Sequence, residues 1–203
     1  MRKIIEMKKA ERLLSPYFPL IAVSVETAFL DYIEMIQRGC KAQNKPITLN
    51  ARSKATVIHD LVTSRIAENF KNLYGIKAKE YRNVFGLYFK DQFFLRFKKF
   101  NQSLAPCLSI SRQTKKYEGQ QCTIPGFPRK ATLLYVGYTF NTAMTGVEKL
   151  YISCRVNGQS EWIFDVSDYL YPLGKQIILY SNDRPKAKNR IRFNEPMELR
   201  KAS

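Results

Sequence analysis

The sequence predicts an α+β fold, in which two to three N-terminal helices pack on an antiparallel sheet of about five strands. Two observations predict it: apolar residues recur at helical spacing up to Gly75, and the period becomes strand-like after it. With 203 residues, 45% of them hydrophobic, the chain can bury one substantial core. We expect a single domain over residues 1–180, with a helical part at 1–75 and a sheet part at 80–180. A basic tail at 181–203 has the composition of a mobile segment.

The helical part reads as three segments in order. A short basic helix is expected from Ile4 to Leu14, and it ends at "SPYFP", where two prolines remove backbone donors. The next segment, "LIAVSVETAFLDYIEMIQRGC", has helical periodicity and a plausible C-terminal stop at Gly39. Asn50 can cap a third helix by accepting a hydrogen bond from a free amide. That helix carries an apolar stripe at Ile58, Val62, Ile66, Phe70 and Leu73.

Five strands are expected in the sheet part. "NVFGLYFKDQFFLRFKKF" contains two of them around a turn at Lys90-Asp91, and the second alternates between two faces. Its apolar face has Phe93, Leu95 and Phe97. The other strands are expected in "ATLLYVGYTFN", "VEKLYISCRV" and "EWIFDVSDYL", which short turns connect as an antiparallel meander.

The formal net charge of +17 indicates the class of partner. Self-repulsion of this size disfavours a compact state, so we expect an anionic partner, and nucleic acid is the commonest one. Residues 147–168 carry mostly acidic charges, so one side of the protein should be much more positive than the other. The expected nucleic-acid-binding residues are Arg96, Lys98, Lys99, Lys115, Lys116, Arg129, Lys130, Arg184, Lys186, Lys188, Arg190 and Arg192.

No cofactor, metal site or membrane span is expected. The four cysteines are scattered without a CxxC pair, which favours reduced thiols in a cytoplasmic protein. No run of eighteen apolar residues occurs, and the N-terminus lacks the long apolar segment of a signal peptide. Glycine-rich phosphate loops and the GxSxG motif are absent as well.

The candidate catalytic residues are His59, Arg52 and Asp60. Arg52 and His59 lie two helical turns apart and share a face. Their spacing resembles the R-x4-6-H motif of the HEPN ribonucleases, in which an imidazole moves a proton while a guanidinium holds a phosphate. HEPN domains are entirely helical, whereas this chain has a sheet. The alternative is a structural histidine at the helix edge, bonded to a carbonyl or to Asp60.

The predicted hairpin allows a second interpretation. A helix followed by "KDQFFLRFKK" resembles the PD-(D/E)xK nucleases, with Asp91 as the first acid and Lys98 as the lysine. Arg96 stands where the second acid belongs, and its charge would repel a metal ion. A phosphate-contacting surface formed by Arg96, Lys98 and Lys99 is the simpler interpretation.

Four segments between residues 50 and 166 resemble a bacterial family often encoded beside a helix-turn-helix protein with an ImmA/IrrE-type domain, as in Rosmer-type antiphage toxin-antitoxin modules. They are "NARSKATVIHD", "LYFKDQFFLRFKKFNQSL", "IPGFPRKATLLYVGYTFN" and "VEKLYISCRVNGQSEWIFDV". The resemblance implies a toxin that a cognate antitoxin or regulator holds inactive. The charge predicts that it acts by binding nucleic acid, and His59 and Arg52 suggest RNA cleavage as its potential activity. The alternative is a non-catalytic DNA-binding or regulatory protein of phage or mobile-element origin.

Overall fold

A computed structural model describes residues 2–81, 83–89, 92–109, 111–121, 124 and 130–170. These residues form an α+β fold in which N-terminal helices pack on a six-stranded sheet. The expected basic tail lies outside the described residues, as do Arg129 and the tail residues Arg184, Lys186, Lys188, Arg190 and Arg192.

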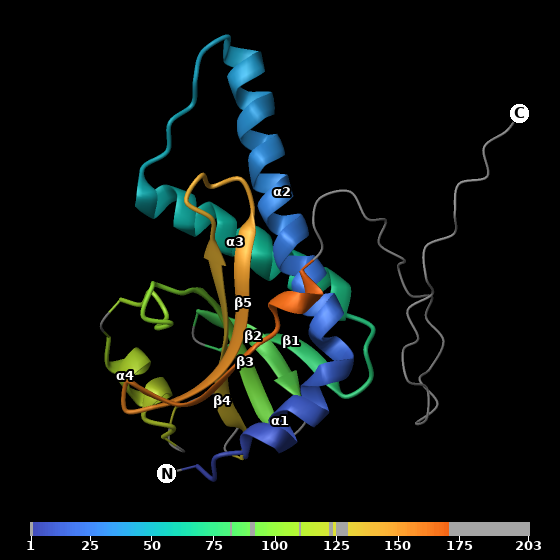
Figure 1. Cartoon of the computed structure of the whole chain (residues 1–203), viewed down its shortest axis with the longest axis vertical. Helices are drawn as coiled ribbons and strands as arrows, with labels where there is room; N and C mark the ends of the chain where they lie inside the picture. Colours follow the sequence, from blue (N-terminus) through green and yellow to red (C-terminus); the bar gives the residue numbers. More distant parts are fainter. Residues whose placement is uncertain are drawn as a thin grey trace, which may run out of the picture.

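Three helices cover one face of the sheet. Helix α1 (Met7–Leu14) leads through a 3-10 turn, η1 (Ser15–Tyr17), into the long helix α2 (Phe18–Gln43), which has Pro19 in its first turn. Gly39 does not end α2 as expected. The helix continues to Gln43, and Asn44 ends it in a left-handed conformation with φ 51°. The C-terminal half of α2 projects beyond the sheet before the chain returns to α3 (Figure 1).

Helix α3 (Ala51–Phe70) has the predicted cap and four of the five predicted stripe residues, while Leu73 lies beyond its end. The Asn50 side chain accepts a hydrogen bond from the amide of Ser53 at 2.8 Å. The stripe residues Ile58, Val62, Ile66 and Phe70 are all buried. Arg65 joins α3 to α2 through two hydrogen bonds to the carboxylate of Asp31, at 2.6 and 2.9 Å.

The strands lie in the order of the chain: β1 (Ile76–Tyr81), β2 (Val84–Phe89), β3 (Phe93–Lys99), β4 (Thr132–Phe140), β5 (Val147–Val156) and β6 (Gln159–Asp165). Strand β1 is the one beyond the five expected. Its sequence is largely polar because it is an edge strand, so it lacks a strong apolar signal. A second 3-10 turn, η2 (Ser167–Tyr169), follows β6.

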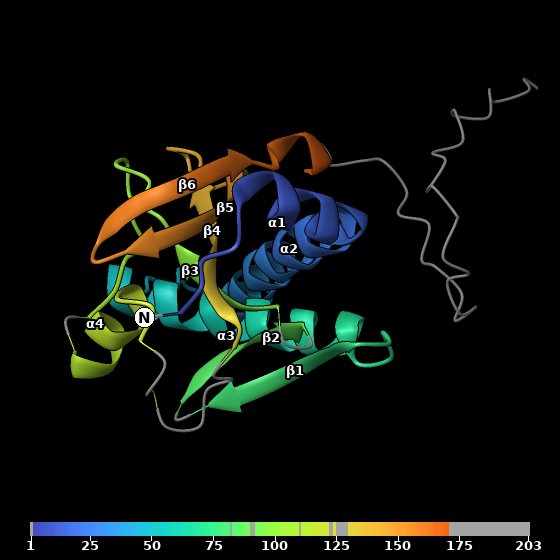
Figure 2. The ribbon, with the colours of Figure 1, turned by 90° about the horizontal axis from the view of Figure 1, so that it is seen from below.

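Strands β3 and β4 are parallel, which the expected meander did not include. A parallel pair needs a crossover, and here residues 100–131 supply it with helix α4 (Arg112–Glu118). Helix α4 packs on the face opposite α1–α3, where Tyr117 lies in a second core with Phe94 and Tyr135. Figure 2 shows the sheet curving so that β1–β2 and β5–β6 flank α2.

The two faces of β3 follow the predicted alternation. Phe93, Leu95 and Phe97 lie in the core beneath α1–α3, whereas Phe94 lies in the core beneath α4. Strand β2 pairs with β3 only from Phe93 to Leu95. The later residues of β3 therefore have β4 on one side and no β2 partner on the other.

Among the described residues, one stretch, Met7–Gln43, is long and apolar enough by composition to cross a membrane, with mean hydropathy 1.5 over an 18-residue window. Half of that window is buried within the fold, where Ile21, Val25 and Phe29 contribute to the core. A core helix of this kind passes the same test of length and composition.

Candidate nucleic-acid-binding site

His59 lies at the edge of the α3 stripe, directly after the buried Ile58, and is itself partly buried. Its Nε2 atom lies 3.4 Å from the Nζ atom of Lys98 on β3. Since β2 has no partner residue beside this part of β3, the long side chain of Lys98 can reach α3. The contact joins one residue from the helical part of the chain to one from the sheet part.

The polarity of this contact determines the histidine tautomer. A lysine ammonium has only donors, so Nε2 must accept and Nδ1 carries the proton of the neutral ring. Nδ1 is buried, and no described residue accepts its hydrogen bond. The bond to a carbonyl or to Asp60, which the structural interpretation of His59 requires, does not form within the described residues.

Burial and neighbouring positive charges lower the pKa values of both His59 and Lys98. Burial, followed by the charges of Lys98 and Arg96, lowers the pKa of His59 to about 4. Burial and the charge of Arg96 lower the pKa of Lys98 to about 8, although the carboxylate of Asp60 opposes that shift. At neutral pH the imidazole is therefore neutral and the ammonium is mostly charged.

The other two candidate catalytic residues, Arg52 and Asp60, are both exposed and lie outside the contact between His59 and Lys98. Asp60 is exposed and acts on Lys98 through its charge. Arg52 is exposed near the start of α3, and no hydrogen bond or ion pair joins it to His59 in the described part of the chain. The structure thus brings Lys98, and not Arg52, to the histidine.

Arg96 faces α4 and is positioned by aromatic rings. Its guanidinium carbon lies 5.5 Å from the ring centre of Tyr117 and 6.0 Å from that of Tyr135. Both distances are within the range of cation–π contacts. No sequence pattern indicates these partners, since α4 is short and Tyr117 is its one buried residue.

The other described basic candidates lie on different sides of β3. Lys99 points to the opposite face from Lys98, with its Nζ 5.7 Å from the ring centre of Phe140. Lys130 precedes β4, whose first residue pairs with Phe93 at the far end of β3. Lys115 and Lys116 are exposed on α4.

Helix α4 and the first turns of α3 lie on the same side of the molecule in both views, at different heights in Figure 1 (Figures 1 and 2). We call the group formed by Arg52, Lys98, Lys115 and Lys116 the basic end. By contrast, exposed acidic side chains gather on β5, β6 and η2: Glu148, Glu161, Asp165 and Asp168.

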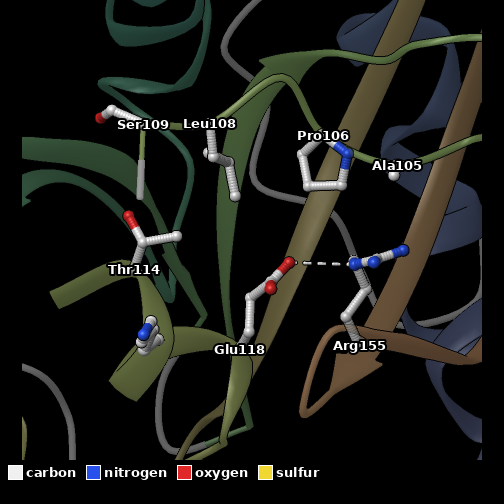
Figure 3. A pocket seen from close by; sticks show the side chains of 8 residues that line it. Ala105, Pro106, Leu108, Ser109, Thr114, Glu118 and Arg155 are labelled. Atoms are coloured by element: carbon white, nitrogen blue, oxygen red, sulfur yellow. Dashed lines mark hydrogen bonds and ion pairs between the residues drawn. The ribbon is translucent and has the colours of Figure 1, made fainter. Parts of the chain in front are cut away.

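A depression of about 290 Å³ adjoins the basic end, between α4 and residues 105–109. Figure 3 shows the carboxylate of Glu118 among its lining residues, directed toward Arg155. Glu118 Oε1 accepts a hydrogen bond from Arg155 Nε at 3.0 Å, and Arg155 also donates to the carbonyl of Gly158. No sequence motif indicates this site, because its two charged residues are 37 positions apart.

Comparison with known proteins does not identify a function for this site. No protein-family model, curated protein or solved structure matches the chain. The function proposed for the protein therefore rests on the described residues and on the resemblance of the four sequence segments.

Proposed function

We propose that this protein binds nucleic acid at its basic end, as the toxin component of a bacterial toxin-antitoxin or phage-defence module. The observation that carries the binding proposal is the contact of His59 with Lys98, beside Arg96, at the end where Lys115 and Lys116 are exposed. The toxin role rests on the order of the four segments that resemble the Rosmer-type modules. In this proposal it acts in the cytoplasm, and a cognate antitoxin or regulator holds it inactive.

Phosphate is the ligand that best suits the basic end. Three elements contribute cations there, and the net charge of +17 makes an anionic partner favourable. Lys98 is partly desolvated by burial, so a bound phosphate would restore the interactions that its ammonium lost. Nucleic acid presents many phosphates in a row and can engage Arg52, Lys98 and Lys115 together.

RNA cleavage is a further proposal that the ionisation of His59 and Lys98 supports. A neutral imidazole can take the proton of a ribose 2′-hydroxyl, and a charged ammonium can stabilise the phosphate or protonate the leaving oxygen. Lys98 would have to leave Nε2 and move to the phosphate. The phosphate charge would then raise the pKa of His59 and make it a stronger base.

The non-catalytic alternative is favoured by one observation. Nε2 contacts Lys98 and Nδ1 is buried, so neither imidazole nitrogen is open to a substrate without rearrangement. In this case His59 would hold the Lys98 side chain against α3, and the protein would bind nucleic acid without cutting it.

Expression in a bacterial host tests these proposals. We expect the wild-type chain to stop growth and degrade bulk RNA, leaving DNA intact, while His59→Ala and Lys98→Met restore growth. Lys77→Met, on the exposed edge strand β1, serves as a charge-matched control and should remain toxic. Equal toxicity of wild type and His59→Ala would remove the catalytic role of His59. Normal growth with the wild type, at matched protein levels, would contradict the toxin role.

A further inference from the structure

The depression beside α4 combines apolar walls with a partly free carboxylate. Pro106 and Leu108 form one wall, and Glu118 and Arg155 lie across from them (Figure 3). Arg155 is 8% exposed and is held in place by its hydrogen bonds to Glu118 and to Gly158. At about 290 Å³ it is just below the roughly 300–1,000 Å³ of small-molecule sites, and it suits one flat ring system better than a whole cofactor.

Its polar groups specify the ligand chemistry. Glu118 Oε1 accepts one hydrogen bond, from Arg155, and can accept a second, whereas no described residue donates to Oε2. A carboxylate only accepts hydrogen bonds, so the group that enters must carry N–H donors. Lys115, one turn earlier on α4, also lines the depression and requires an acceptor. Guanine has this pattern on one edge, with N1–H and N2–H₂ beside O6, whereas adenine, cytosine and uracil lack the adjacent pair of donors.

The depression is also continuous with the proposed nucleic-acid surface. The amide of Cys107 donates to the carbonyl of Lys99 at 2.8 Å, and Pro106 forms a β-bridge with Phe100. These contacts fix one wall of the depression to the end of β3 that carries Lys98. We propose that the depression is a base-specific subsite that takes an unstacked guanine of a single strand whose phosphates lie on the basic end; this rests on the proposed function. Single-stranded recognition commonly uses such splayed bases.

Binding of short oligouridine strands with one central guanosine, adenosine or cytidine tests the subsite. The strands carry 2′-O-methyl groups so that attack by a 2′-hydroxyl cannot cleave them, and fluorescence anisotropy gives each Kd. We expect the guanosine strand to bind about tenfold more tightly than the others. Glu118→Gln should remove this preference and leave the affinity for plain oligouridine within about twofold, whereas Glu161→Gln, on the exposed surface of β6, should keep the preference.

Glu118 also binds α4 to β5, so its substitution can disturb the fold. Leu108→Trp is the second variant, because it fills the depression and leaves the ion pair with Arg155 intact. It too should abolish the guanosine preference. Equal Kd values for all strands, or a preference that survives both substitutions, would overturn the subsite while the proposed function stands. If no strand binds at all, the proposed function itself fails.

Discussion

The pair formed by His59 and Lys98 shows how neighbouring charges and burial set the state of single residues. Their nitrogen atoms lie 3.4 Å apart, and each loses hydration in the fold. Two protonated groups at this distance would repel each other, so the histidine stays neutral. Since the chain has one histidine, its ionisation can be followed without assignment problems.

We predict that replacing Lys98 by Met raises the pKa of His59, because one of the charges that oppose its protonation is removed. In the wild type the His59 pKa should be about 4. The pH titration of the imidazole proton signals by NMR measures both values. Lys77→Met, on the exposed edge strand β1 two strands away from β3, should leave the titration unchanged. An unchanged pKa in Lys98→Met would contradict the contact.

The same shift predicts how stability depends on pH. The pKa of His59 is about 4 in the folded protein against an ordinary value of 6.5, so the unfolded chain binds more protons between these values. The contribution of His59 to the free energy of unfolding is therefore constant above about pH 6.5. As the pH drops toward 4, this free energy falls by up to about 3 kcal/mol. Denaturant unfolding of His59→Gln should show a smaller loss over this range than the wild type.

At the scale of elements, the crossover between β3 and β4 creates the second face of the site. The buried amide of Gln120 fixes the end of α4, since it donates to the carbonyl of Leu133 at 2.6 Å and accepts from the amide of Leu133 at 2.9 Å. Phe100, at the start of the crossover, packs over Gly137 of β4. A Cβ atom at Gly137 would overlap with this ring, so glycine is required there.

We predict that Gly137→Ala lowers the free energy of unfolding by about 1–3 kcal/mol, because Phe100 is buried and cannot move freely. Gly146→Ala is the matched control, as the nearest atom to its added Cβ would be 3.9 Å away. Its unfolding free energy should stay within about 0.5 kcal/mol of wild type. Equal stabilities of the two variants in urea would show that the Phe100 contact is unimportant.

Periodicity accounts for the parts of the fold that the sequence could predict. The stripe of α3 and the alternation of β3 come from residues with one side in the core, such as Ile58 and Phe97. Strand β1 and helix α4 were not predicted, because β1 is a polar edge strand and α4 buries only Tyr117. The contacts of the candidate residues, such as that of His59 with Lys98, depend on the point at which the pairing of β2 with β3 ends. No local sequence pattern predicts that point.

At the scale of the whole molecule, charge is distributed unevenly over the fold. Lys115 and Lys116 are exposed on α4, whereas exposed carboxylates lie on β5, β6 and η2. Such asymmetry orients an approaching polyanion toward one end, and the attraction weakens as salt screens it.

The salt dependence of binding tests the central claim most directly. For an uncleavable single-stranded RNA, log K should fall linearly with log salt, and the double variant Lys115→Met/Lys116→Met should reduce the slope by roughly 1.4, since each lost phosphate contact removes about 0.7. The double variant Lys77→Met/Lys79→Met on β1 should keep the wild-type slope. Affinity that does not fall with salt, or equal slopes in the two double variants, would contradict binding at the basic end.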